Sequence, residues 1–288
     1  MLIDTHCHMN IMTRKFDTKE PFQPFTNDEF IQLQNIIADA QKESVTTIIN
    51  VGTNYIESIA CIQIAQLFEN CYATIGLHPN DSDDNWQKTI ELFKILLETK
   101  EDPSLLFELR RGGQARIVGI GECGIDKHYP DFNLRQQQDV FHAQIQLALE
   151  HDLALVIHSR DADQETYDVL AQYRGEKNFR GTIHCFSSDE RYAQKYLDLG
   201  FVLGFGGTVT YPKNETLRNV VTMIPLEKII LETDAPFLPP QSLRGKPNHP
   251  AYIKIIAQYI AQLRGESFET VMETTAKTTQ KLFGIIAS

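Results

Sequence analysis

Short apolar runs alternate with longer segments of helical periodicity along almost the whole sequence. Strands are predicted over residues 2–5, 47–51, 72–76, 117–121, 154–157, 181–183, 201–203 and 228–231. After each of them, apolar side chains recur at the spacing of an α-helix. Repeated β-α units imply parallel strands, and eight such units close naturally into a (β/α)8 TIM barrel. The pattern therefore predicts an α/β fold of this class.

The helices are predicted over residues 28–43, 54–69, 86–100, 134–151, 162–173, 189–199, 214–223 and 251–263, and an additional C-terminal helix over 267–283. Ser267 fits the N-cap of this last helix, and Gly284 fits its C-terminal stop. Residues 10–27 are predicted to be a loop, because the segment is polar and holds two prolines. Residues 101–116 are predicted to be a surface excursion, because they include Pro103 and a pair of glycines.

Two histidines separated by one residue, His6 and His8, end the first apolar run. Alternate side chains of a strand share a face, so this spacing directs both imidazoles into one pocket. Four more residues of metal-ligand type each follow a predicted strand: Glu122, His158, His184 and Asp234. Any one of them fits an ordinary hydrogen bond, but a whole set at the ends of separate strands is hard to produce by core packing. Together the donors predict a site for two divalent cations.

The main alternative fold is an open, doubly wound sheet, which brings only a few strand ends together at one switch point. The ligand-type residues follow the first, fourth, fifth, sixth and eighth predicted strands. A closed ring of strands converges such ends on its mouth, whereas an open sheet spreads them along an edge. We expect one domain over residues 1–288, because no internal linker is rich enough in glycine, serine or proline to mark a boundary.

The six donors suggest how two cations are shared. His6, His8 and Asp234 are predicted to hold one cation, and His158 and His184 the other, with Glu122 bridging both. Two cations about 3.5–4 Å apart lower the pKa of a bound water and hold both oxygens of an in-line displacement. Asp234 could also accept a proton, so Asp234 and Glu122 are the predicted catalytic residues. Mixed nitrogen and oxygen ligands fit Mg²⁺, Mn²⁺ or Zn²⁺ without selecting among them.

Three of the five cysteines, Cys7, Cys123 and Cys185, adjoin predicted ligands. One interpretation is a thiolate zinc site. The interpretation we favour follows from strand geometry: immediate neighbours point to opposite faces, so these thiols are buried behind the site as small apolar groups. The cysteines show neither C-x-x-C pairing nor an even count, so no disulfide framework is expected.

The net charge of −11, from 27 basic and 38 acidic residues, is the reverse of a general nucleic-acid coat. Binding of a polyanion would have to be local. The candidate substrate-binding residues are His78, Arg135, Arg160 and Arg244. Arginine's planar fork grips phosphate through two hydrogen bonds, although surface salt bridges and, for His78, a structural turn are the alternatives. Three loop aromatics could stack on a base or could simply pack: Tyr129, Phe186 and Phe237.

Six short motifs carry a family resemblance: IDTHCH (3–8), GLHP (76–79), GECGID (121–126), IHSRDA (157–162), HCFS (184–187) and ETDAPFL (232–238). They resemble the TatD family of metal-dependent deoxyribonucleases, which are amidohydrolase-like barrels, and they occur in the family's order. The resemblance implies a nuclease acting on DNA, often as a 3′→5′ exonuclease on single strands, with the six donors named above as ligands. The excursion at 101–116 and the long loop after His8 exceed compact members, and Ile125 replaces a common leucine, so polarity and strand preference stay open.

Two other functions remain open. One is hydrolysis of a different ester or amide bond, such as D-aminoacyl-tRNA deacylation, with which some TatD-like proteins are credited. The other is a barrel that binds metal or nucleic acid without catalysis, which the acidic charge favours and the complete donor set opposes. No apolar stretch approaches the roughly 20 residues of a membrane span. We expect a cytoplasmic protein with DNA as its partner and no membrane association; the sequence identifies no stable protein partner.

Overall fold

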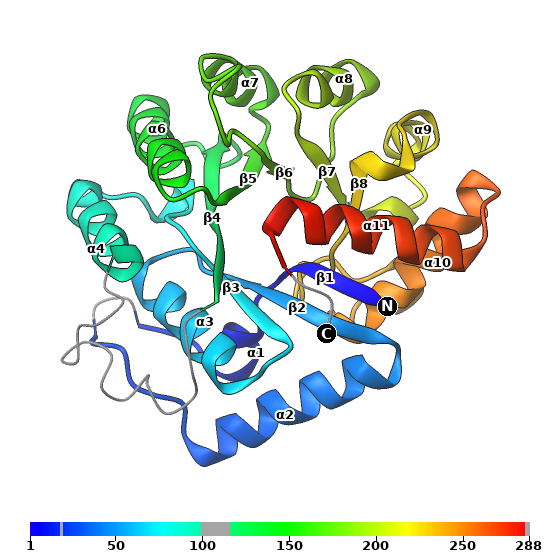
Figure 1. The fold of residues 1–288 in the computed structure, drawn as a ribbon, viewed down its shortest axis with the longest axis horizontal. Helices are drawn as coiled ribbons and strands as arrows, with labels where there is room; N and C mark the ends of the chain where they lie inside the picture. Colours follow the sequence, from blue (N-terminus) through cyan, green and yellow to red (C-terminus); the bar gives the residue numbers. More distant parts are fainter. Residues whose placement is uncertain (18–19, 99–115, 286–288) are drawn as a thin grey trace. The chain divides into compact units, whose positions relative to one another are not determined.

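The computed structural model describes residues 1–17, 20–98 and 116–285 of the chain (Figure 1). Its strands form one eight-stranded sheet, in which the order of the strands follows the order of the chain. The pairs β3–β4, β4–β5, β6–β7 and β7–β8 are parallel. Helices alternate with the strands along the sequence. The predicted fold class, an α/β fold of the (β/α)8 TIM-barrel type, is confirmed.

The strands are β1 (Leu2–Cys7), β2 (Val45–Val51), β3 (Cys71–Ile75), β4 (Ile117–Asp126), β5 (Ala154–Arg160), β6 (Gly181–Ile183), β7 (Val202–Phe205) and β8 (Ile229–Leu231). The helices are α1 (Met9–Thr13), α2 (Asn27–Lys42), α3 (Tyr55–Leu67), α4 (Trp86–Glu98), α6 (Leu134–Glu150), α7 (Asp163–Ala171), α8 (Glu190–Asp198), α9 (Glu215–Met223), α10 (Ile253–Arg264) and α11 (Phe268–Phe283). Most of these bounds agree with the predicted ones to within two residues.

Strands β4 and β5 are longer than predicted, so Glu122 and His158 lie within strands rather than after them. Glycines in the middle of β4 explain why the predicted strand ends too early, at residue 121. Gly121 has a φ of +148°, and a Cβ atom there would lie only 2.4 Å from the carbonyl oxygen of Val156. The pairing register with β5 shifts between Ile120 and Cys123, and the strand then continues. Glycine thus allows an irregularity that re-aims a side chain without ending the strand.

The prediction of a continuous loop over residues 10–27 is wrong at its start, where α1 forms. This helix has only five residues, and no side chain caps its N-terminus, so neither periodicity nor a capping residue predicted it. It forms because Met9 and Asn10 are fully buried. The excursion predicted over residues 101–116 lies outside the described residues, apart from Arg116.

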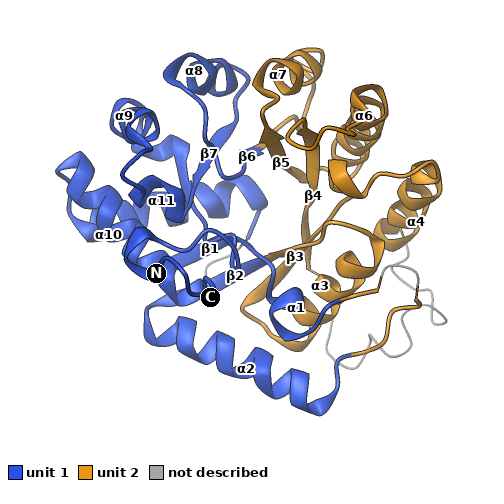
Figure 2. Ribbon diagram, turned by 180° about the vertical axis from the view of Figure 1, so that it is seen from behind, with its two compact units in different colours: residues 1–15, 25–49, 182–288 blue, residues 16–24, 50–181 orange. Residues whose placement is uncertain are grey.

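The chain divides into two compact units, which Figure 2 colours separately. Unit 1 comprises residues 1–15, 25–49 and 182–288, and unit 2 comprises residues 16–24 and 50–181. Unit 1 holds β1, β7, β8 and most of β2 and β6, whereas unit 2 holds β3, β4 and β5. A single domain over the whole chain stays a prediction.

The additional C-terminal helix, α11, packs against β1 and β8 within unit 1. The hydroxyl of Ser267 accepts a hydrogen bond from the backbone N–H of Thr270, and Gly284 adopts the left-handed conformation at the other end. Both predicted helix signals are therefore confirmed. Among the described residues, no helix combines the length and the apolar character needed to cross a bilayer; cytoplasmic location stays a prediction.

Candidate metal centre

In unit 1, the end of β1 is fastened to the segment that follows β8. Asp4 is fully buried, and its carboxyl group accepts hydrogen bonds from the backbone N–H of Thr233 at 2.9 Å and of His6 at 3.3 Å. The backbone N–H of Asp234 donates to the carbonyl of His6, and that of His8 donates to the carbonyl of Ala235, both at 2.8 Å. These bonds place Asp234 beside the two histidines.

Three donor atoms converge there. Nε2 of His6 and Nε2 of His8 are 3.1 Å apart. Oδ1 of Asp234 lies 3.3 Å from Nε2 of His8 and 3.8 Å from Nε2 of His6. Ligands bound to zinc at about 2.0–2.1 Å in a tetrahedron are roughly 3.3 Å from one another. The spacing and the chemistry of these donors therefore fit one divalent cation.

Asp234 is suited to stay ionised at neutral pH. Burial alone would raise the pKa of its carboxyl group. The hydrogen bond with His8 and the positive charge that His184, His6 and His8 can carry outweigh this effect, and the pKa is lowered. An ionised carboxylate can act as a ligand and can accept a proton.

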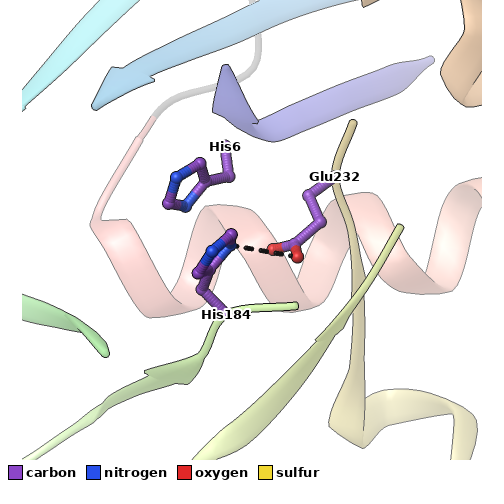
Figure 3. A group of neighbouring side chains, drawn as sticks. All are labelled: His6, His184 and Glu232. Atoms are coloured by element: carbon purple, nitrogen blue, oxygen red, sulfur yellow. Dashed lines mark ion pairs between the residues drawn. The ribbon is translucent and has the colours of Figure 1, made fainter. Parts of the chain in front are cut away.

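His184 lies against His6 in the same unit. The two imidazole rings are stacked, with centroids 3.6 Å apart and planes inclined by 20°. Figure 3 shows this stack together with Glu232, which extends from the segment after β8 toward the ring of His184. Oε1 of Glu232 is 3.2 Å from Nδ1 of His184.

Glu232 was missed in the sequence analysis, although a signal was present. Glu232 and Asp234 alternate in the string ETD, as His6 and His8 alternate in HCH. Only Asp234, the second acidic residue of ETD, is among the predicted ligands. Glu232 is fully buried, and its carboxylate accepts a hydrogen bond of 2.5 Å from the backbone N–H of Cys185.

In unit 2, His158 lies between two carboxylates. Its Nδ1 is 2.7 Å from Oε1 of Glu122, and its Nε2 is 3.1 Å from Oδ2 of Asp126. Adjacent pairing of β4 and β5 brings these side chains together, because Gly124 and His158 are partners in the ladder. The predicted ligands Glu122 and His158 are thus neighbours.

Asp126 is the second residue that the sequence analysis missed. It is almost completely buried, and its carboxylate also accepts hydrogen bonds from the side chain of Asn80 and the backbone N–H of His128. Burial would raise its pKa, but the hydrogen bonds and the charge of His158 lower it well below the usual range. Glu122 and Asp126 are four residues apart in one strand, so strand alternation could have identified it.

His78 also contacts this group. Its ring lies edge-on to His158 with centroids 4.4 Å apart, and its Nε2 is 3.6 Å from Oε1 of Glu122. Nδ1 of His78 accepts a hydrogen bond from the backbone N–H of Asn80. The ring proton of neutral His78 is therefore on Nε2, which makes this atom a hydrogen-bond donor rather than a metal ligand.

The three candidate arginines are exposed and occupy different surroundings. Arg160 ends β5, two residues beyond His158, and its guanidinium lies 5.9 Å from the ring centre of Tyr129. Arg244 lies 4.6 Å from the ring centre of Tyr211 in unit 1. Arg135, in the first turn of α6, lines a surface pocket that also contains two aspartates. Asp84 and Asp139 line the same pocket, so the substrate-binding and the salt-bridge interpretations of Arg135 both stay open.

The three aromatic candidates differ in how much of each side chain is exposed. Phe186 is 2% exposed and packs against Tyr196 and Phe205, so the packing alternative holds for this residue. Tyr129 and Phe237 are about half exposed, at 50% and 51%, and stay candidates.

The five cysteines are all free, and Cys7 and Cys123 are fully buried. The prediction that these two thiols lie behind the ligands as small apolar groups is confirmed. Cys185 is only partly buried. The backbone of Cys185 has a φ of 44°, and its N–H group donates a hydrogen bond to the carboxylate of Glu232.

Comparison with known proteins agrees with this site chemistry along the whole chain. The family model described as TatD related DNase matches residues 3–284. A protein of Bacillus subtilis named uncharacterized metal-dependent hydrolase YabD is 33% identical over 285 residues, covering 99% of this chain and all of that protein. A Citrobacter rodentium protein named 3′-5′ ssDNA/RNA exonuclease TatD is 32% identical over 266 residues, covering 90% of this chain and 95% of that protein.

A solved structure shows the same fold. The crystal structure of YjjV, a TatD homologue from Escherichia coli K12, has a TM-score of 0.81 and 28% identity, and the match covers 99% of this chain and 98% of that one. Fold, donor set and relatives define a metal-dependent hydrolase of the (β/α)8 class. The chain belongs to the TatD related DNase family.

Proposed function

We propose that this protein hydrolyses phosphodiester bonds of DNA, as a 3′→5′ exonuclease acting on single strands. The observation that carries the proposal is the convergence of Nε2 of His6, Nε2 of His8 and Oδ1 of Asp234 at the spacing of cation ligands. The Glu122–His158 pair of unit 2 offers further donors. The name of the Citrobacter rodentium relative supports a nucleic-acid substrate.

In this proposal the ligands are the six residues predicted from the sequence: His6, His8, Asp234 and His184 of unit 1, and Glu122 and His158 of unit 2. Two divalent cations, Mg²⁺, Mn²⁺ or Zn²⁺, would supply Lewis-acid activation of a water and of the phosphate. Asp234 takes the proton of the attacking water on its carboxylate. The oxygen of the water bonds to phosphorus, the ester P–O bond breaks, and the leaving oxygen takes up the proton held by Asp234, which regenerates the carboxylate.

Substrate contacts fall to groups that donate hydrogen bonds. Nε2 of His78 is placed to donate to a phosphate oxygen, since its Nδ1 is already an acceptor. Arg160 and Arg244 are exposed, and each lies against a tyrosine ring. Each of them can grip phosphate through two hydrogen bonds.

The test is an end-labelled single-stranded oligonucleotide incubated with the protein and Mg²⁺, Mn²⁺ or Zn²⁺ in turn. We expect metal-dependent release of mononucleotides from the 3′ end, and no release by the His6→Ala and Glu122→Ala variants. His151→Ala is the matched control, because His151 lies at the C-terminal end of α6 and is not among the predicted ligands. Full activity of His6→Ala would refute the mechanism.

The alternative is hydrolysis of another ester or amide, such as D-aminoacyl-tRNA, by the same donors. A parallel assay on D-aminoacyl-tRNA separates the two. Turnover of this substrate without release of nucleotides from DNA would replace the nuclease proposal by the deacylase. Metal binding without turnover of either substrate would favour a binding protein.

A further inference from the structure

The carboxylate of Glu232 is held in a position that folding alone does not account for. It is fully buried, and Oε2 accepts no hydrogen bond from any residue that the structure describes. Burying a carboxylate oxygen without a partner costs stability, because the oxygen loses its hydration and gains no bond in return. Oε1, in contrast, accepts a hydrogen bond from the backbone N–H of Cys185 and lies at ion-pair distance, 3.2 Å, from Nδ1 of His184, with which it forms no hydrogen bond in this structure.

Glu232 could in principle be a third ligand of a cation shared with His6 and His184, since the three side chains cluster closely. The ring geometry argues against this. The imidazoles of His6 and His184 are stacked almost parallel (Figure 3). Lone pairs of imidazole nitrogens lie in the ring plane, so stacked rings do not direct them to a common point between the rings.

We propose that Glu232 is a positioning residue, which holds Nδ1 of His184 toward its own carboxylate and leaves Nε2 of His184 for the cation. A histidine that binds metal commonly donates its other N–H to a carboxylate, which fixes both the tautomer and the orientation of the ring. Glu232 additionally anchors the backbone of the next residue, Cys185, whose φ of 44° is unusual for a side chain of this kind. This inference rests on the proposed function.

Gly204 of β7 provides the space for this carboxylate. A Cβ atom at position 204 would lie 2.3 Å from Oε2 and 2.9 Å from Cδ of Glu232. Alanine there would force the carboxylate to move. Two residues later, a Cβ atom at Gly206 would lie at least 3.5 Å from every atom of Glu232, which is ordinary contact. The two glycines therefore offer a matched pair of substitutions.

The experiment compares the wild type with E232Q, G204A and G206A. Long-range ¹H–¹⁵N correlation spectra of the metal-free proteins give the tautomer of His184, and competition with a chromogenic chelator gives the affinity for Zn²⁺. We expect wild-type His184 to carry its proton on Nδ1. In E232Q we expect a mixture of tautomers and roughly 10–100-fold weaker Zn²⁺ binding, because a neutral amide attracts Nδ1–H less strongly. G204A should reproduce both changes, and G206A neither.

A melting temperature of each metal-free protein separates positioning from a structural role. We expect the melting temperature of E232Q to be no lower than that of the wild type, because the substitution removes the charge of a buried oxygen that accepts no hydrogen bond. Wild-type tautomer and Zn²⁺ affinity in E232Q would overturn the proposal, whatever the melting temperature. If the wild type itself bound no Zn²⁺, the proposed function would fail, and the tautomer of His184 in the metal-free variants would still decide the role of Glu232.

Discussion

The two units surround their histidines differently. In unit 1, His6 and His8 point Nε2 at each other and share one nearby oxygen of Asp234, so three electron-rich atoms converge. In unit 2, His158 lies between the carboxylates of Glu122 and Asp126 and contacts one with each ring nitrogen. His6, His8 and Asp234, the unit 1 group, therefore need a cation or a proton between their donor atoms. Glu122, Asp126 and His158, the unit 2 group, are held together by their own ion pairs.

The largest expected effect comes from removing one donor from each group. His8→Ala should reduce the number of bound Zn²⁺ ions from two to one, and His158→Ala should do the same. Both should lower nuclease activity by more than the roughly 10–100-fold that is typical of losing an outer partner. Isothermal titration gives the number of ions, and the oligonucleotide assay gives the activity. Two ions bound with unchanged affinity in His8→Ala would show that the unit 1 group is not a ligand set.

Removing the metal should affect the two groups unequally. A ligand present at 100 times its Kd stabilises the folded state by about 2.7 kcal/mol. We expect chelation by EDTA to increase amide hydrogen exchange around residues 6–8 and 232–235 more than around residues 122–126 and 158–160. Hydrogen exchange measured by mass spectrometry with and without Zn²⁺ tests this. An equal increase in both segments would contradict the contrast between the groups.

A substitution in unit 2 sharpens the same contrast. Asp126→Asn keeps the shape of the side chain but removes the charge beside Nε2 of His158. We expect Zn²⁺ affinity to fall by about tenfold, toward the small end of the range for outer partners, because the proposed ligands Glu122 and His158 are both unchanged. Asp161→Asn is the control, since Asp161 is an exposed carboxylate that pairs with His128. Equal effects of the two substitutions would show that Asp126 acts only through its general negative charge.

The sequence predicted the fold class and each helix and strand that carries a donor, because strand and helix periodicities reflect burial directly. It also predicted which residues are metal donors, and their role as ligands stays a prediction. It did not single out Glu232 and Asp126, since a buried carboxylate beside a histidine looks like any other acidic residue until its partner is known. It left stacking and packing both open for Phe186, because one-residue register decides whether a loop aromatic faces the site or the core. The length of β4 was obscured by its glycines, and that of β5 by the polar residues His158, Ser159 and Arg160 at its end.

The smallest expected effect concerns the segment that supports the unit 1 group. The side chain of Asn248 donates hydrogen bonds to the carbonyls of Thr233 and Phe237, on either side of Asp234. The next residue, His249, caps a 3₁₀ turn (η6, Pro250–Tyr252) by accepting a hydrogen bond from the backbone N–H of Ala251 on Nδ1. Protonation of Nδ1 would convert this acceptor into a donor and break the cap.

Burial lowers the pKa of His249 below its ordinary value of 6.5, although the charge of Asp39 opposes this. The unfolded chain therefore takes up the proton first, and stability is lost as the pH falls through 6.5 toward the lower folded pKa. His249→Asn keeps an acceptor but does not titrate, so its stability relative to the wild type should rise over this range, by less than the roughly 1 kcal/mol of an N-cap bond. Urea unfolding of both proteins in EDTA at pH 8 and pH 5 measures the difference between their free energies of unfolding. If this difference did not change with pH, His249 would be excluded as the source of acid sensitivity in this part of unit 1.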